Sequence, residues 1–217
     1  AGECGACGGA TGAGKSSIIN LLCRFYEYQK GRITIDGHDL RAIPLDALRS
    51  AVGVVLQDVF LFTGSLKENI TLFDPEISDE LVQESVKAVG VEGLVKRLPG
   101  GIEYDVKERG VMLSTGQRQL ISFVRAYAQQ PGILVLDEAT SSIDPESEGL
   151  IQAATARLTE SRTSILVAHR LSTIQDADRI IVLDQGQIVE SGHHDELLSQ
   201  KGRYSRLFEM QMDSNNA

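Results

Sequence analysis

Residues 9 to 16 have the types and the spacing of a loop that binds phosphate. The segment reads Gly-Ala-Thr-Gly-Ala-Gly-Lys-Ser and fits the pattern G-x4-G-K-[ST]. Glycines let consecutive backbone N–H groups approach phosphate oxygens without a Cβ in the way. Lys15 can reach the outer phosphates of a nucleotide, and the Ser16 hydroxyl can hold Mg2+. The alternative is a flexible glycine-rich N-terminus that simply ends at a helix.

Two adjacent acids form a second candidate site. The apolar run Ile133–Leu136 leads directly into Asp137 and Glu138. A buried strand that ends this way delivers carboxylates to the edge where α/β sheets bind ligands. There Asp137 can hold Mg2+, directly or through water, and Glu138 can orient and deprotonate an attacking water. An ordinary strand end with solvated acids is the alternative, and the phosphate loop favours the functional interpretation.

A third motif lies at the start of a predicted helix. Leu113-Ser-Thr-Gly-Gln117 precedes a run with apolar residues on one side. Ser114 and Gln117 fit S-x-x-Q, which is a capping box with a purely structural role. An exposed helix N-terminus with Gly116 and a serine hydroxyl can also bind a phosphate. The residues alone leave both interpretations open.

The elements that must position these residues alternate between helix and strand. Apolar residues recur at helical spacing after Lys15, and Ile33 and Ile35 alternate with polar residues before a turn. Short apolar runs predict buried strands at residues 52–56, 133–136, 164–167 and 179–183. Residues 77–129 read as mainly helical, and residues 195–212 as a helical tail. This alternation predicts an α/β fold with a mostly parallel sheet.

The strand that should feed the phosphate loop is a poor one by composition. Residues 4–8 read Cys-Gly-Ala-Cys-Gly and contain no β-branched residue. Because glycine weakens strands, we expect a soft anchor for the loop. The C-x2-C spacing of Cys4 and Cys7 is that of half a zinc site, but no second pair stands nearby, so we interpret the three cysteines as reduced thiols.

Composition excludes several other classes of protein. The chain has 217 residues, 42% of them hydrophobic and 24% charged, which is typical of a globular domain. Its net charge of −9 argues against nucleic acid as a partner, because phosphate contacts need clustered cations. No apolar run approaches the length of a membrane span, and no secretory leader opens the sequence.

The three motifs, in this order, resemble those of the nucleotide-binding domain of an ATP-binding cassette (ABC) transporter. Residues 9–16 look like Walker A, residues 133–138 like Walker B with its catalytic glutamate, and residues 113–117 like the family signature. Gln57 stands where the family has its Q-loop, His169 where it has the switch histidine, and Asp144 ends a segment similar to the D-loop. The resemblance extends from Gly2 to about Met212.

The resemblance implies one domain over residues 1–217. Its fold would be a P-loop NTPase core with a mostly parallel sheet, an inserted α-helical subdomain and a partial antiparallel β subdomain. The RecA-like core would comprise about 1–76 and 130–217, and the helical subdomain about 77–129. It implies ATP and Mg2+ as cofactors, with Ser16, Gln57 and Asp137 at the metal and Lys15, Glu138 and His169 catalytic. The implied nucleotide-binding residues are Gly9, Ala10, Thr11, Gly12, Ala13, Gly14, Lys15, Ser16, Ser17, Gln57, Ser114, Gly116, Gln117 and Asp144.

The resemblance also implies partners. Two such domains pack head to tail around two ATP molecules, so that Ser114, Gly116 and Gln117 of one copy bind the γ-phosphate held by the other. The segments 58–69, 105–110 and 192–197 are similar to those of bacterial multidrug- or lipid-type exporters. The expected function is therefore ATP hydrolysis that powers export, at the cytoplasmic face of the plasma membrane, with a transmembrane domain as partner and this chain alone soluble.

The sequence departs from the family at two places. Thr115 stands where the signature commonly has glycine, and only eight residues precede Gly9, none of them aromatic. The family has further strands and an adenine-stacking aromatic residue before Walker A. We therefore expect a fragment or truncated product, and the alternative function is a nucleotide-binding module with weak or no ATP binding and no turnover. A soluble ABC ATPase of DNA repair or translation is disfavoured by the exporter-like segments and the acidic charge.

Overall fold

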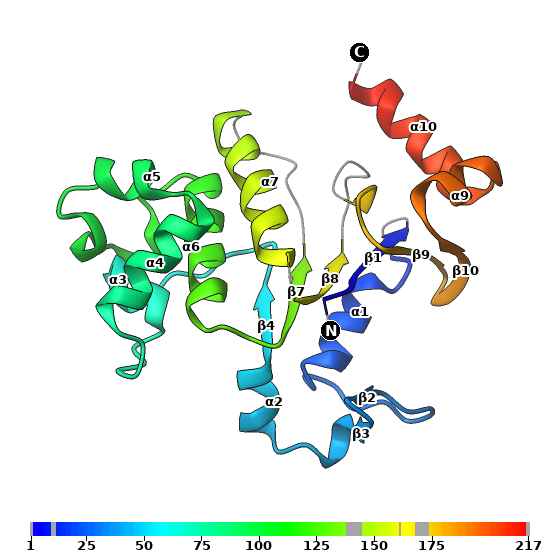
Figure 1. Cartoon of the computed structure of the whole chain (residues 1–217), viewed down its shortest axis with the longest axis horizontal. Coiled ribbons are helices and arrows are strands. Elements are labelled where there is room, and N and C mark those ends of the chain that lie inside the picture. Colours follow the sequence, from blue (N-terminus) through cyan, green and yellow to red (C-terminus); the bar gives the residue numbers. More distant parts are fainter. Residues whose placement is uncertain (1, 10–11, 138–144, 161, 168–173, 216–217) are drawn as a thin grey trace.

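A six-stranded sheet forms the centre of the molecule in the computed structural model (Figure 1). The structure describes residues 2–9, 12–137, 145–160, 162–167 and 174–215. The strand order is β10-β9-β1-β8-β7-β4; five of these strands run parallel, and only β10 is antiparallel to its neighbour β9. The bounds are β1 Cys4–Gly9, β4 Val52–Val55, β7 Ile133–Asp137, β8 Thr163–Val167, β9 Arg179–Asp184 and β10 Gln187–Gly192.

Strand β1 differs from the expectation of a weak strand. It extends over six residues and pairs in parallel with β8 on one side and β9 on the other. Its first residue is held as well, because the Cys4 N–H donates to the Asp178 carboxylate at 2.8 Å. Pairing on both sides therefore overrides the low strand propensity of the glycines.

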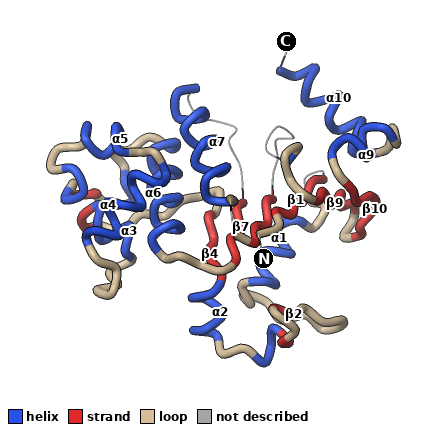
Figure 2. The backbone as a smooth tube through the Cα atoms, viewed as in Figure 1, coloured by secondary structure: helices blue, strands red, loops and turns tan. Residues whose placement is uncertain are grey.

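Helices cover both faces of the sheet and gather beyond its β4 edge (Figures 1 and 2). Helices α3, α4, α5 and α6 lie together on that side, whereas α1 lies near β1. The helix bounds are α1 Lys15–Leu22, α2 Leu45–Ala51, α3 Leu66–Thr71, α4 Asp79–Val89, α5 Glu92–Arg97, α6 Thr115–Ala128, α7 Pro145–Thr159, α9 His194–Ser199 and α10 Arg203–Asn215. The 3-10 turns are η1 Leu40–Ala42, η2 Gly101–Glu103 and η3 Glu108–Gly110.

Two small antiparallel pairs accompany the main sheet. Strand β2 (Thr34–Ile35) pairs with β3 (His38–Asp39) across the predicted turn, and β5 (Gly64–Ser65) pairs with β6 (Asp105–Val106). The second pair joins the segment after β4 to the segment that precedes α6. Within the described ranges, none of the helices combines the length and the apolar character that crossing a membrane requires.

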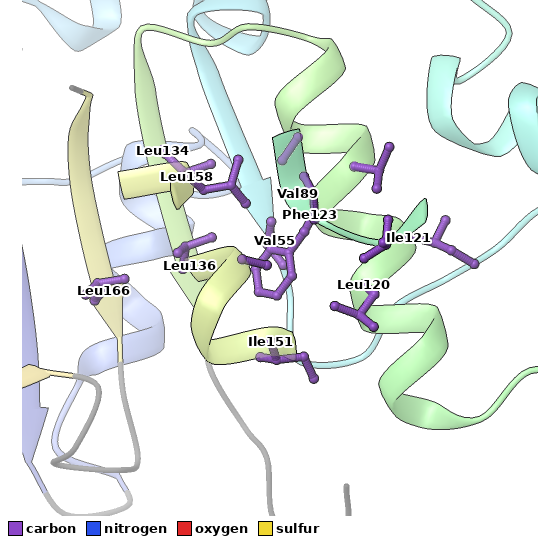
Figure 3. Close-up of a cluster of buried hydrophobic side chains, with 14 of the residues drawn as sticks. Val55, Val89, Leu120, Ile121, Phe123, Leu134, Leu136, Ile151, Leu158 and Leu166 are labelled. Atoms are coloured by element: carbon purple, nitrogen blue, oxygen red, sulfur yellow. The ribbon is translucent and has the colours of Figure 1, made fainter. Parts of the chain in front are cut away.

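Alternating side chains of the central strands build two separate cores. Leu134 and Leu136 of β7 pack with Phe123 of α6 and Leu158 of α7 in the larger core (Figure 3). Val135, between the two leucines, belongs to the second core on the other face of the sheet. This second core also contains Ile19 of α1, Leu48 of α2 and Val167 of β8. Period-two patterning of a strand buried on both faces explains this division.

The C-terminal region forms two helices where the sequence predicted a single helical tail. Helix α9 ends at Ser199 and α10 begins at Arg203, with Lys201 in the left-handed region at φ 50° between them. The Glu190 carboxylate of β10 accepts hydrogen bonds from the backbone N–H groups of Arg203 and Tyr204. These bonds satisfy donors at the start of α10, so a new helix can begin there.

Candidate nucleotide-binding site

The carboxyl ends of the parallel strands bring three predicted site residues to one edge of the sheet. Strand register places Asp137 opposite Val167 of β8, and Val167 opposite Cys7 of β1. The chain of β1 then continues through Gly9 into the predicted phosphate loop. Strand β4 pairs with β7, and Gln57 follows two residues after its end. Ligands of open α/β sheets bind at this edge.

Glycine conformations shape the described part of the phosphate loop. Gly9, Gly12 and Gly14 have φ values of 150°, 82° and 109°, which residues with a Cβ rarely adopt. A Cβ on Gly9 would lie 2.5 Å from the backbone oxygen of Leu183 in β9. Glycine at this position therefore lets β1 run against β9 and still turn into the loop.

Helix α1 begins at this loop without a side-chain cap. Its N-cap is Gly14, which has no side chain to accept hydrogen bonds from the first turn. The positive end of the helix dipole and the N–H groups of the first turn thus lie beside the loop, as an anion site requires. Ser16 and Ser17 are both exposed in this first turn, and Ala13 is buried.

Lys15 is held inside the site. Its side chain is 5% exposed, and Nζ donates to the Gly9 carbonyl at 2.7 Å. Burial lowers the pKa of Lys15 from its ordinary value, while electrostatic interactions with Asp137 and, to a smaller extent, Cys7 raise it. The structure thus brings Lys15 and Asp137 within electrostatic range. The half-buried Asp137 carboxylate balances a cation that is otherwise costly to bury.

The donor set at this edge suits a hard cation such as Mg2+. Ser16 offers a hydroxyl, Asp137 a carboxylate and Gln57, which is exposed, an amide oxygen. Mg2+ prefers oxygen ligands and is usually held by one or two carboxylates together with substrate phosphates and water. Among the described residues no group of three or more His, Cys, Asp or Glu side chains could hold a metal ion, Cys4 and Cys7 included. Such a group is not needed for this kind of magnesium site.

The predicted signature forms the capping box at the start of α6. The Ser114 Oγ accepts from the Gln117 N–H at 3.2 Å, and the Gln117 Oε1 accepts from the Ser114 N–H at 3.0 Å. Ser114 is exposed, Gln117 is half-buried and Gly116 is buried. Helix α6 lies with α3–α5, away from α1 (Figure 1). The structure therefore supplies the capping role directly and does not bring this motif to the phosphate loop of the same chain.

Five predicted site residues lie outside the described residues. They are Ala10, Thr11, Glu138, Asp144 and His169. Their assigned roles stay predictions from the sequence.

The sequence analysis missed one contact to the phosphate loop. The Gly186 N–H, in the turn between β9 and β10, donates to the Ala13 carbonyl at 2.9 Å. Strand β10 was not predicted, although Asp184-Gln-Gly between two apolar runs is a hairpin signal. Which loop a hairpin turn touches cannot be read from such a signal.

Comparison with known proteins places the chain in a family. The family model described as ABC transporter matches residues 1–141. This chain belongs to the ABC transporter family. The α/β fold with a mostly parallel sheet agrees with this, because the structure superimposes on a bacterial Atm1-family ABC exporter with ATP bound, with a TM-score of 0.89 and 40% sequence identity. That match covers 97% of this chain and 37% of the exporter chain.

Curated relatives of this ABC domain carry the names of ATP-binding proteins of transporters. The chain is 51% identical over 203 residues to the putative ABC transporter ATP-binding protein exp8 of Streptococcus pneumoniae, covering 94% of this chain and 35% of that protein. It is 50% identical over 210 residues to the probable multidrug resistance ABC transporter ATP-binding/permease protein YheH of Bacillus subtilis. This match covers 97% of this chain and 31% of YheH. The chain thus spans about a third of the length of these relatives.

Proposed function

We propose that this ABC domain binds Mg-ATP and hydrolyses it to power an exporter. One observation carries the proposal: the uncapped start of α1, the buried Lys15 and the Asp137 carboxylate converge at the carboxyl edge of a parallel sheet. A cation and a positive helix end beside an acid suit a phosphate chain bound together with a metal ion. The names of the relatives, multidrug export among them, supply the transport context.

In this proposal each residue has a separate task. Lys15 moves from the Gly9 carbonyl to the β- and γ-phosphates, and the first N–H groups of α1 bind the same anion. Ser16, Gln57 and Asp137 would hold Mg2+, which when bound would neutralise negative charge on the phosphate oxygens. Glu138 takes a proton from the attacking water, and His169 contacts the γ-phosphate.

The second half of each site comes from another nucleotide-binding domain. Ser114, Gly116 and Gln117 of the partner bind the γ-phosphate, and Asp144 is a further nucleotide-binding residue in this proposal. The exposed position of the α6 start supports this, since a surface helix end can reach a second chain. Closure then depends on the γ-phosphate, and hydrolysis opens the dimer.

The remaining assignments follow from the same proposal. Residues 77–129 act as a helical subdomain on a RecA-like core of residues 1–76 and 130–217. A transmembrane domain is the second partner, and the chain works at the cytoplasmic face of the membrane.

The test is the rate of Mg-ATP hydrolysis at increasing protein concentration. We expect a specific rate that rises with concentration, because two chains share each site. The Glu138→Gln variant should bind ATP as the wild type does, fail to turn it over and accumulate as a dimer on size-exclusion chromatography. Absence of ATP binding by the wild type would contradict the proposal and favour a module without turnover. Wild-type turnover by Glu138→Gln would contradict the role of Glu138.

A further inference from the structure

The turn between β9 and β10 lies directly against the phosphate loop. In this turn Gln185 and Gly186 both have positive φ values, 47° and 77°. The Gly186 N–H donates to the Ala13 carbonyl at 2.9 Å. A Cβ built on Gly14 would lie 3.5 Å from the Gly186 Cα, so any side chain at position 14 would contact the turn. The turn thus touches the loop through this hydrogen bond and leaves little room for a side chain at Gly14.

The orientation of one peptide group gives this contact a function. In a trans peptide the C=O of one residue and the N–H of the next point in opposite directions. Gly186 holds the Ala13 carbonyl toward the β9–β10 turn. The Gly14 N–H on the same peptide is therefore directed away from that turn. A flipped peptide would instead present a carbonyl oxygen on the side to which this N–H points, and an anion would be repelled there.

The far side of the same hairpin is fixed to the C-terminal helix. Arg203 at the start of α10 contacts Asp184 at the end of β9, with Nη1 and Oδ2 2.7 Å apart. Glu190 of β10 accepts from the N–H groups of Arg203 and Tyr204. The Tyr204 side chain is fully buried, and its hydroxyl lies 2.7 Å from His194 Nδ1 of α9. The turn is therefore held between the phosphate loop and α10.

We propose that Gly186 is a positioning residue of the phosphate loop, and that α10, through Arg203 and Asp184, helps to set the affinity of the loop for ATP. This inference rests on the proposed function, because ATP is the ligand whose affinity changes. Gly186 acts through Ala13 and Gly14 and does not touch the nucleotide itself. Its loss should therefore raise KM and leave kcat unchanged.

The test compares two substitutions at one position. Gly186→Val places a β-branched residue at φ 77°, which is strained whatever the space around it. Gly186→Asn adds a side chain of similar reach, but asparagine tolerates this conformation. A Cβ at Gly186 meets nothing within 4 Å, so the two variants differ in backbone strain and not in crowding. KM for ATP and the dissociation constant of ATP should rise about fivefold to tenfold in Gly186→Val and stay unchanged in Gly186→Asn.

A second arm covers the case in which Gly186→Val does not fold. Arg203→Met and Asp184→Asn each remove the ion pair without changing the turn. Because the pair is partly exposed, each should raise the dissociation constant only about twofold. The double variant should show the same rise as either single variant, since both remove one interaction.

The outcomes separate this inference from the proposed function. If the wild type binds ATP and a folded Gly186→Val binds it equally well, the positioning role is wrong while the proposed function stands. A fall in kcat at constant KM would also overturn it. If Gly186→Val does not fold, the inference is overturned when both ion-pair variants bind ATP with the wild-type dissociation constant. If the wild type does not bind ATP, the proposed function fails and this inference with it.

Discussion

Two helix starts in this molecule carry the motifs of a phosphate site, and they are built in opposite ways. Helix α1 begins at Gly14 with no side-chain cap, next to a buried lysine and the end of a central strand. Helix α6 begins at Ser114 with a complete capping box and an exposed N-cap residue. No side chain caps the donors of the first helix, whereas side chains of the second helix satisfy two of its donors within the chain.

In our proposal, this difference corresponds to two stages of phosphate binding. The α1 site is shaped by β1, β9 and the β9–β10 turn before any ligand arrives. At the α6 site the Ser114 hydroxyl already accepts the Gln117 N–H and can turn its own hydrogen toward a phosphate. In our proposal the first site supplies most of the affinity for ATP, and the second adds a contact only when two chains meet.

The largest expected effect is at the first site. Lys15→Met removes the only lysine or arginine side chain that we assign to the phosphates within one chain, so turnover should fall at least about 100-fold. ATP hydrolysis and ATP binding measure this effect, and circular dichroism serves as the control for folding. Turnover at the wild-type rate would contradict the proposal that the α1 site supplies most of the affinity for ATP.

Gly9→Ala should damage the first site through the backbone. The new Cβ would lie 2.5 Å from the Leu183 oxygen in a conformation with φ 150°, so β1 and β9 must separate. We expect the free energy of unfolding to fall by about 1–3 kcal/mol, together with weaker ATP binding. Gly93→Ala is the matched control, because its Cβ meets nothing within 4 Å on α5 and it should stabilise the helix by about 0.5–1 kcal/mol. Equal urea midpoints for Gly9→Ala and the wild type would contradict this account.

Ser114 allows the two roles of the second site to be separated. Ser114→Ala removes the cap and should lower the free energy of unfolding by about 1 kcal/mol. Ser114→Asp keeps a good N-cap, so stability should be retained, but its charge repels the partner's γ-phosphate. Urea unfolding and the ATPase rate together distinguish the roles: both variants should lose turnover, and only the alanine variant should lose stability. If the Ser114→Asp variant kept its ATPase activity, helix capping would be the whole role of Ser114.

The smallest effect is expected at Thr115. Its hydroxyl accepts a hydrogen bond from Arg118 on the same exposed helix turn, at 3.2 Å. Thr115→Ala should change the free energy of unfolding by less than about 0.5 kcal/mol and leave turnover nearly unchanged, because Ser114 and Gly116 are retained. If this variant lost much of its ATPase activity at saturating ATP, Thr115 would also belong to the second site, contrary to our assignment.

The sequence predicted most elements of the fold because their signals are local. The four predicted strands appear within one residue of their expected bounds, and a helix follows the phosphate loop as expected, since apolar runs and helical spacing reflect burial directly. Strand β1 was underestimated because its stability comes from two neighbours far along the chain. The break before α10 was missed for a similar reason, because the cap is Glu190 of another element.

For the candidate site, motifs predicted the residues but not their arrangement. Asp137 and Cys7 are at the same register position, because both pair with Val167 of β8. This arrangement depends on the order of strands in the sheet, which no local sequence pattern specifies. The Ser114 capping box was predicted as one of two alternatives, and the geometry now shows that it forms. The contact of Gly186 with Ala13 joins residues 173 positions apart (186 − 13), beyond the reach of any motif.

The central place of β1 has a consequence for how the chain folds. Of the six strands in this sheet it comes earliest in the chain, yet both of its partners lie after residue 160, in β8 and β9. Pairing between such distant segments makes formation of the sheet slow, because the entropy of closing a long loop is lost before the stabilising contacts form. During synthesis the N-terminal segment must therefore wait for nearly the whole domain to emerge. The phosphate loop is translated well before β8 and β9, the strands that position it, and so is among the last parts of the sheet edge to acquire its shape.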